Sequence, residues 1–187
     1  MVLLRKRLRK LKKPLKALLM ILLVAYLVFA AYKSLYYVGV NVVGSSMEPT
    51  LQSDAVGYTR KVSNSTKFHY DDIVVVDAPD ADYLVIKRII GLPYDTIEFK
   101  AGTLYRNGQQ IDESYLSSNA DADLTILSEV TLEPDEVFIA GDNRTNSKDS
   151  RDYGPVKIKD IKGIGFEESK TSEIIMDAKT WLYSKVK

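Results

Sequence analysis

The feature that most constrains this chain is an uncharged, strongly apolar run near its N-terminus, residues 17–32, with the sequence ALLMILLVAYLVFAAY. It is apolar on every side of a helix, which excludes an amphipathic helix on a protein surface. Sixteen helical residues span about 24 Å, less than the roughly 30 Å of a bilayer's hydrocarbon core. Uncharged residues 34–38 add length, and the long side chains of Lys16 and Lys33 can reach the interface. We therefore expect residues 17–37 to form one transmembrane anchor.

The charges around this run predict its orientation. Residues 1–16 carry eight Lys or Arg and no acid, so by the positive-inside rule they form a basic cytoplasmic tail, and residues 38–187 form an extracytoplasmic body. A cleaved secretory signal has the same basic start and apolar centre and is the alternative. The run is longer than the usual apolar part of a signal and lacks a clear A-x-A site, which favours the uncleaved anchor.

Composition excludes several classes of function for the body. Nine of the 26 Lys and Arg precede residue 34, which leaves 17 basic against 25 acidic residues after it. An acidic body disfavours nucleic-acid binding. The chain has no cysteine and one histidine, His69, so it offers no thiolate nucleophile or disulfide, and a protein-built metal site is disfavoured. We expect no metal and no cofactor.

After residue 38 the pattern favours short strands. Segments rich in Val, Ile and Tyr alternate with turn residues, and Asn107-Gly108 is a strong hairpin signal. The predicted fold class is mainly β, a single N-terminal helix followed by an all-β sandwich or barrel-like body of short antiparallel strands. Loops are expected at residues 63–68 and 117–123, and a helix packed on the body at 172–187. Strands are expected at residues 38–43, 55–60, 73–77, 83–91, 96–100, 124–132, 137–140 and 161–167.

Two adjacent serines in the stretch GSSMEPTL, residues 44–51, are candidate nucleophiles. A serine hydroxyl needs a base, and a lysine can serve if removal from water lowers its pKa. Lys87 suits this, because in DYLVIKRIIG it shares a strand face with Val85 and Ile89. The alternative is an edge lysine with its amine in water. Arg88 points to the opposite face and stays charged at any relevant pH.

A third polar cluster, GDNRTNSKDSRDYGPV, covers residues 141–156. Its density of acids, arginines and serines suits a hydrogen-bonded loop that fixes a site through Asp–Arg pairs. It equally suits a solvated surface loop.

Taken together, these segments resemble the type I signal peptidases, membrane-anchored serine proteases that remove signal peptides from exported proteins. The basic tail and anchor come first, and GSSMEPTL matches the family's G-x-S-M-x-P-T-L. YDDIVVVDAP (70–79), IKRIIGLPYDTIE (86–98) and GDNRTNSKDSRDYG (141–154) resemble later family stretches, in the family's order. The single anchor and compact body are closer to the Gram-positive pattern than to the larger two-anchor one.

This resemblance implies the roles of individual residues. Ser46, which directly precedes Met47, would be the nucleophile, and Lys87 the general base. Ser147 would hydrogen-bond the lysine amine, and Met47 would line a substrate pocket. The remaining implied site residues support the oxyanion hole or the site, and they are Gly44, Arg88, Asp142, Arg144, Asp149 and Arg151.

Two positions depart from the family pattern. Gly44 lacks the hydroxyl that some relatives add to the oxyanion hole, which leaves the Ser46 backbone N–H as a donor. Tyr94 replaces the glycine usual in the LPGD turn, so this turn must accommodate a side chain. The lysine base leaves His69 no catalytic task, so we expect it in a loop.

The implied substrates are the signal peptides of secreted preproteins, bound as an added strand and cut after small residues, and the implied site of action is the outer face of a membrane. Two alternatives remain. One is a Ser/Lys peptidase of the same broad fold that cleaves itself or a regulator. The other is a non-enzymatic extracytoplasmic binding module, in which GSSMEPTL is only a turn.

Overall fold

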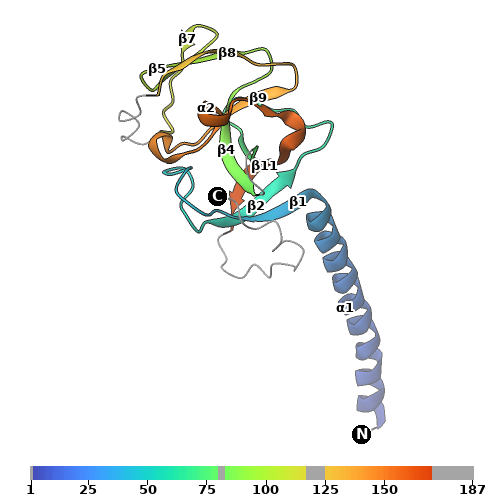
Figure 1. Cartoon of the computed structure of the whole chain (residues 1–187). Coiled ribbons are helices and arrows are strands. Elements are labelled where there is room, and N and C mark those ends of the chain that lie inside the picture. The colour runs from blue at the N-terminus through green and yellow to red at the C-terminus, as the bar shows by residue number, and fades with distance from the viewer. Residues whose placement is uncertain (1, 80–82, 117–124, 170–187) are drawn as a thin grey trace. The chain divides into compact units, whose positions relative to one another are not determined.

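The computed structural model of the chain describes residues 2–79, 83–116 and 125–169 (Figure 1). It divides into two units, Met1–Tyr37 and Val38–Lys187. The predicted loop at 117–123 and the predicted C-terminal helix at 172–187 lie outside the described residues.

The first unit is dominated by one helix, α1 (Val2–Tyr36), so the basic tail is helical as well as the apolar run. Its stretch Pro14–Tyr36 is long and apolar enough to cross a membrane, and none of it is buried in the protein. At 1.5 Å per residue, 23 residues span about 35 Å, which exceeds a hydrocarbon core of about 30 Å. The exposed apolar side chains of this stretch are those that lipid, rather than water, would solvate favourably.

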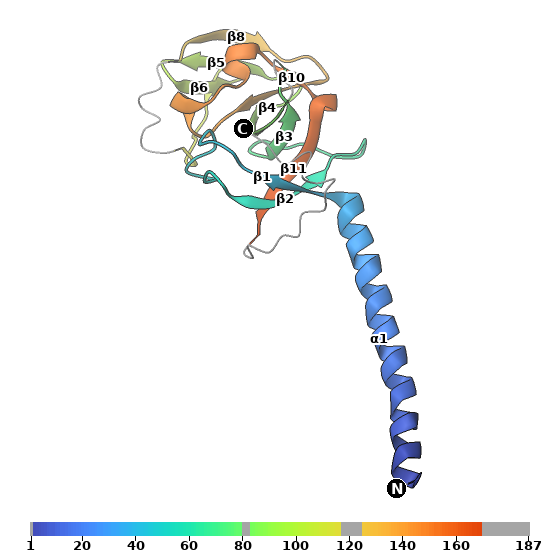
Figure 2. The same ribbon diagram turned by 60° about the horizontal axis from the view of Figure 1, so that its bottom comes forward.

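The second unit is built from two sheets, and every strand pair whose register is defined is antiparallel. The larger sheet has seven strands in the order β1-β2-β11-β3-β4-β9-β10. Figure 2 shows β3 and β4 side by side within it. Its strands are β1 (Tyr37–Asn41), β2 (Val56–Lys61), β3 (Ile73–Asp77), β4 (Leu84–Gly91), β9 (Glu136–Ala140), β10 (Val156–Lys157) and β11 (Ile161–Glu168).

The smaller sheet has four strands in the order β7-β6-β5-β8. The predicted hairpin at Asn107-Gly108 connects β6 to β7, and both residues have the positive φ that such a tight turn requires. The strands of this sheet are β5 (Thr96–Lys100), β6 (Thr103–Arg106), β7 (Gln109–Gln110) and β8 (Leu127–Thr131).

Strand β4 is the element that positions the site. It pairs with β3 on one side and β9 on the other, and all its residues after Leu84 are buried. Val74 of β3 faces Lys87, which places the lysine on the face of the sheet that carries Val85 and Ile89. The alternative of an edge lysine in water is therefore wrong.

Short helical segments connect the last strands. They are a 3₁₀ turn at Arg144–Asn146, the single-turn helix α2 (Ser150–Tyr153) and a 3₁₀ turn at Ile158–Asp160. Asp149 caps α2, because its carboxylate accepts a hydrogen bond from the Arg151 N–H. The Asp152 carboxylate in turn accepts one from the Asp149 N–H, which completes a capping box. The mainly β fold after one N-terminal helix is confirmed, with strand boundaries close to those predicted.

Candidate active site

The side chains of Ser46 and Lys87, 41 residues apart in sequence, meet in the body. Lys87 Nζ lies 2.8 Å from Ser46 Oγ and also donates to the Ile86 carbonyl at 3.0 Å. Ser46 sits in the turn that follows β1 and is half-buried, whereas Lys87 is only 2% exposed. The serine is therefore partly exposed, while the amine beside its hydroxyl is shielded from water.

Burial changes the acid–base behaviour of this lysine. Removal from water lowers the pKa of Lys87 from 10.5 to about 8, and the charge of Arg151 acts in the same direction. The negative charges of Asp149 and Asp142 oppose the shift but do not cancel it. A sizeable fraction of the amine is uncharged near neutral or mildly alkaline pH, which is what a general base for a serine requires.

Gly141 brings the polar loop after β9 into contact with the serine. A Cβ at Gly141 would overlap the Ser147 hydroxyl and lie 2.5 Å from the Ser46 carbonyl oxygen. Glycine at this position thus permits the close approach of two chain segments. Ser147 Oγ donates to Asp149 Oδ2 at 2.6 Å, and among the described residues the Lys87 amine bonds only Ser46 and Ile86.

Asp149 organises the far side of this loop. Arg151 donates to both of its carboxylate oxygens, at 2.9 and 3.0 Å, and the Gly141 N–H adds a bond of 2.9 Å. Burial alone would raise the pKa of Asp149, but the bonds and charge of Arg151, with those of Gly141 and Ser147, outweigh it and lower the pKa. The carboxylate is therefore negatively charged at neutral pH, and its charge acts on Lys87.

Arg88, the neighbour of Lys87 on β4, connects the turn that carries Ser46 (residues 44–51, the serine turn) to the same loop. Its guanidinium binds Asp142 in a fork, with Nε–Oδ1 at 2.8 Å and Nη2–Oδ2 at 2.6 Å. Asp142 also accepts the hydroxyl of Thr50, which follows the serine by four residues. Adjacent residues of β4 thus point to opposite faces of the sheet. Lys87 contacts the Ser46 hydroxyl, and Arg88 holds Asp142 and the end of the turn that carries the serine.

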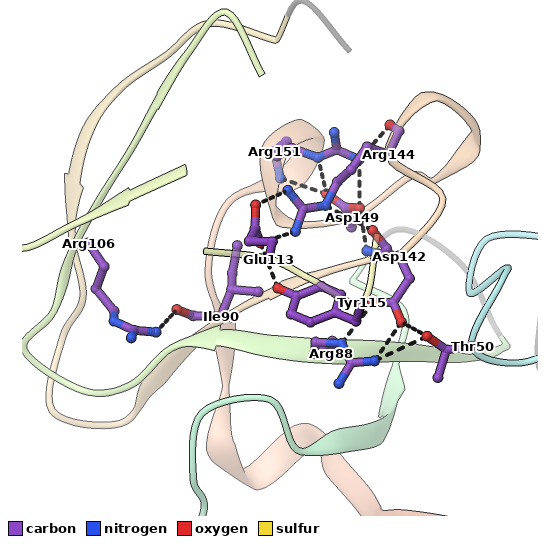
Figure 3. Close-up of polar contacts among 11 residues, drawn as sticks. Thr50, Arg88, Ile90, Arg106, Glu113, Tyr115, Asp142, Arg144, Asp149 and Arg151 are labelled. Carbon is purple, nitrogen blue, oxygen red and sulfur yellow. Dashed lines mark hydrogen bonds and ion pairs between the residues drawn. The ribbon is translucent and has the colours of Figure 1, made fainter. Parts of the chain in front are cut away.

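Arg144 belongs to a third buried pair, drawn with the other two in Figure 3. It is paired with Glu113, and its Nε donates to the Gly141 carbonyl at 3.1 Å. The Tyr115 hydroxyl donates to Glu113 at 2.6 Å, while its ring lies 4.1 Å from the guanidinium carbon of Arg88. These contacts connect the Arg144 pair to the Arg88 pair.

The remaining predicted residues lie as follows. Gly44 is exposed and has a φ of +96°, and no heavy atom lies within 4 Å of where a Cβ would stand. Met47 is fully buried in the cluster of Val40, Val42, Leu51, Val75 and Ile86. Tyr94 has a φ of +71° and is 72% exposed, so the turn accommodates the side chain by turning it into solvent. His69 is an exposed loop residue near Asp72.

Several site residues were not predicted from the sequence. The turn that carries Ser46 accepts hydrogen bonds from Asn143 and Asn146, and its own Thr50 donates one to Asp142. These three residues lie inside segments already singled out as motifs. Glu113 and Tyr115 lie in the polar stretch DESY, which carries no sequence motif. This stretch follows β7, and the tertiary fold brings it into contact with Arg144 and Arg88.

Comparison with known proteins decides the family. The family described as "Signal peptidase, peptidase S26" matches residues 12–167, most of the chain. The chain belongs to the signal peptidase family. Signal peptidase I P of Bacillus subtilis subsp. natto is 36% identical over 158 residues, 80% of this chain and 83% of that protein. Signal peptidase I of Bacillus caldolyticus is 39% identical over 153 residues, 75% of this chain and 83% of that protein.

A crystal structure of a signal peptidase I from Enterococcus faecalis V583 aligns with 54% of this chain and 97% of that chain, at 31% identity and a TM-score of 0.46. A score of this size does not by itself establish a shared fold. Family membership, which rests on the sequence matches, makes the chain a signal peptidase I and a serine endopeptidase. The resemblance drawn from the four sequence motifs is thereby confirmed.

Proposed function

We propose that this signal peptidase cleaves preproteins with Ser46 as nucleophile and Lys87 as general base. The observation that carries the proposal is the 2.8 Å contact between Ser46 Oγ and a lysine amine that is almost wholly buried. Burial keeps the amine available in its neutral form, and the contact gives it a direct path to the hydroxyl proton.

The steps follow from this geometry. The neutral amine of Lys87 takes the Ser46 proton as Oγ attacks the scissile carbonyl, and the resulting ammonium gives that proton to the departing amine. An acyl group then remains esterified to Ser46. Lys87 next takes a proton from a water molecule that attacks the ester, and it returns this proton to Oγ as the signal-peptide carboxylate leaves. Both half-reactions leave the lysine as it began.

The developing oxyanion would be held by the backbone N–H of Ser46. Within the described residues this N–H donates no hydrogen bond, so it is available to substrate. Gly44 contributes no hydroxyl and leaves open space next to the turn. Removal of one oxyanion-hole donor from a serine protease costs about 10²–10³ in kcat.

The supporting residues would act on charge and position. Asp149, paired with Arg151, sets the electrostatic potential at Lys87 and holds Ser147. The Arg88–Asp142 pair fixes the end of the serine turn through Thr50, and Arg144 supports Gly141. The predicted hydrogen bond between Ser147 and the Lys87 amine is not present among the described residues, because Ser147 Oγ donates to Asp149 and the amine bonds Ser46 and Ile86.

The substrate would bind as an added strand next to the serine turn, because backbone pairing reads alternate side chains and suits small residues at the first and third positions before the cut. Met47 would shape such a pocket from beneath, as part of the apolar cluster under the turn.

The membrane arrangement is also a proposal. Residues 17–37 would cross the bilayer once, with the basic tail at 1–16 in the cytoplasm and the catalytic body at 38–187 outside. In sequence, Ser46 follows the end of the proposed anchor by nine residues, so the proposal puts the nucleophile on the outer side of the membrane. An accessibility-labelling experiment on single cysteines introduced at positions 3 and 64 of the cysteine-free chain would test it, since only position 64 should react from outside intact cells.

The catalytic proposal is tested by incubating the detergent-solubilised full chain with a preprotein. Ser46→Ala and Lys87→Ala should each abolish cleavage, whereas Ser65→Ala and Lys67→Ala, two substitutions in an exposed loop, should leave it unchanged. Cleavage of the preprotein, rather than of the enzyme itself, separates this function from a self-cleaving peptidase. Full activity of Ser46→Ala would refute the nucleophile.

A further inference from the structure

Asn143 contacts both peptide groups that flank the nucleophile, and no step of the proposed reaction uses it. Its side-chain Nδ2 donates to the Ser45 carbonyl at 3.1 Å, and its backbone N–H donates to the Ser46 carbonyl at 3.0 Å. The Ser45 carbonyl also accepts the Glu48 N–H at 3.1 Å. One residue thus grips the chain on both sides of the Ser46 Cα.

The first of these bonds has a consequence for the oxyanion donor. The Ser45 carbonyl and the Ser46 N–H belong to the same planar peptide group, in which they point in opposite directions. A bond that fixes the direction of the carbonyl therefore fixes the direction of the N–H. The second bond fixes the next peptide group, so the backbone of Ser46 is held at both ends.

Asn143 is itself held by its neighbours. Asp142 on one side is bound by Arg88, and Arg144 on the other is buried and bonded to Glu113. Thr145 Oγ1 donates to Asn143 Oδ1 at 3.3 Å, which directs the amide nitrogen toward Ser45. The two buried ion pairs thus hold the backbone on either side of Asn143, and Asn143 in turn holds the peptide group that precedes Ser46.

A second asparagine bonds the side chain of Ser45. Asn146 Nδ2 donates to the hydroxyl of Ser45 at 2.7 Å. This bond gives the other serine of the pair a task that is not nucleophilic. It is exposed, so its contribution is expected to be smaller than that of the half-buried Asn143.

We infer that Asn143 is a positioning residue for catalysis, which orients the Ser46 N–H toward the oxyanion and is assisted by the Asn146–Ser45 bond. The inference rests on the proposed function of Ser46. With glycine at position 44 the side chain there adds no donor, so the orientation of this one N–H carries more of the stabilisation. Charge develops on the oxygen only in the transition state, so the effect should fall on kcat rather than on substrate binding.

The test compares Asn143→Ala and Asn143→Asp with the wild-type chain and with Asn64→Ala, an exposed asparagine in another loop. Aspartate keeps the size and the backbone N–H but replaces the amide donor by a carboxylate oxygen. We expect kcat for preprotein cleavage to fall about 10- to 100-fold in both variants, with KM within about threefold of wild type, because a misaimed donor loses part of what a deleted one loses. Asn64→Ala should match wild type.

Two further readouts separate positioning from general damage. For Asn143→Ala the pH midpoint of kcat/KM should stay at the wild-type value, because this change adds no charge and, within the described residues, the Asn143 side chain bonds neither Lys87 nor the charged groups that act on it, Asp149, Arg151 and Asp142. The carboxylate of Asn143→Asp should instead favour the ammonium form of Lys87 and move that midpoint to higher pH. A peptide aldehyde, which adds to Ser46 Oγ as a tetrahedral hemiacetal, should lose affinity in parallel with kcat, while the corresponding peptide alcohol, which cannot form the adduct, should not.

The assisting bond is tested by Ser45→Ala, Asn146→Ala and the double variant. Each removes the same hydrogen bond, so the effect of the double variant on kcat should equal that of either single variant. Wild-type kcat in both Asn143 variants would overturn the inference, as would a loss confined to KM or, in Asn143→Ala, a shifted pH midpoint. If instead Ser46→Ala remained active, the proposed function would fail first, so the two failures are distinguishable.

Discussion

Arg88 and Asp142 form a two-point ion pair, with Nε–Oδ1 at 2.8 Å and Nη2–Oδ2 at 2.6 Å, that joins β4 to the polar loop after β9. Asp142 is fully buried and Arg88 is nearly so. Because both charges are removed from water, each is stabilised mainly by the opposite charge of its partner.

Breaking this pair should unfold the body more easily. Asp142→Ala leaves the Arg88 guanidinium buried without its partner, and we expect the free energy of unfolding to fall by about 3 kcal/mol, as for other buried pairs that lose one member. Denaturant titration followed by circular dichroism measures it. The double variant with Arg88→Ala should lose less than the sum of the two single losses, and strict additivity would contradict a coupled pair.

The charge of Asp149 should set the pH dependence of cleavage. The carboxylate raises the pKa of Lys87 and the nearby Arg151 lowers it, so Asp149→Asn removes a stabiliser of the ammonium while the arginine still disfavours it. The pKa of Lys87 should fall, and the midpoint of kcat/KM should move to lower pH. Asp135→Asn, which removes an exposed acid paired with Lys157, should leave the midpoint in place. A midpoint moved to higher pH would contradict this electrostatic account.

Gly141 should tolerate no side chain. The Cβ of Gly141→Ala would overlap the Ser147 hydroxyl and crowd the Ser46 carbonyl, and overpacking of this kind costs about 1–3 kcal/mol of stability. Because the displaced groups border the nucleophile, cleavage should fall at least about 100-fold, a loss typical of a 1 Å misplacement. Gly108→Ala is a control for destabilisation away from the site, since its Cβ meets nothing but its φ of +76° strains a side chain; it should lower stability and leave cleavage by the folded protein unchanged. Normal cleavage by Gly141→Ala would show that the contact is not needed.

The buried lysine should also appear in the stability of the protein. The pKa of Lys87 is about 8 in the folded chain against 10.5 as its ordinary value, so the unfolded chain binds more protons between these pH values. Stability contributed by this group therefore rises with pH, and the cost of burying the ammonium is fully present below pH 8. Relative to Lys87→Met, the wild-type free energy of unfolding should increase by about 2 kcal/mol from pH 8 to pH 10. A constant difference would mean an unperturbed lysine.

The sequence predicts the parts of this site that depend on local pattern. Lys87 could be singled out because Val85 and Ile89 lie on its face of an apolar strand. The GSSMEPTL motif identifies Ser46, rather than Ser45, as the expected nucleophile. The long-range partners could not be found this way. Glu113 and Tyr115 reach the site through the tertiary fold, and the spacing of Asn143 from Ser46 is 97 residues, which no periodicity encodes.

The turn at Tyr94 shows a different limit. The sequence indicates that a side chain replaces the usual glycine, but only the backbone shows a positive φ that the tyrosine adopts while remaining exposed. Strain of this kind costs about 1–3 kcal/mol and is not visible in composition or pattern.

The central claim is that a neutral Lys87 takes the proton of Ser46, and the pH dependence of kcat/KM for preprotein cleavage tests it most directly. The account predicts a rate that rises about tenfold per pH unit in acid and levels off above a midpoint near 8, the pKa of the buried amine. A rate that is flat from pH 6 to 10, or a midpoint at 10.5, the ordinary value for lysine, would contradict it.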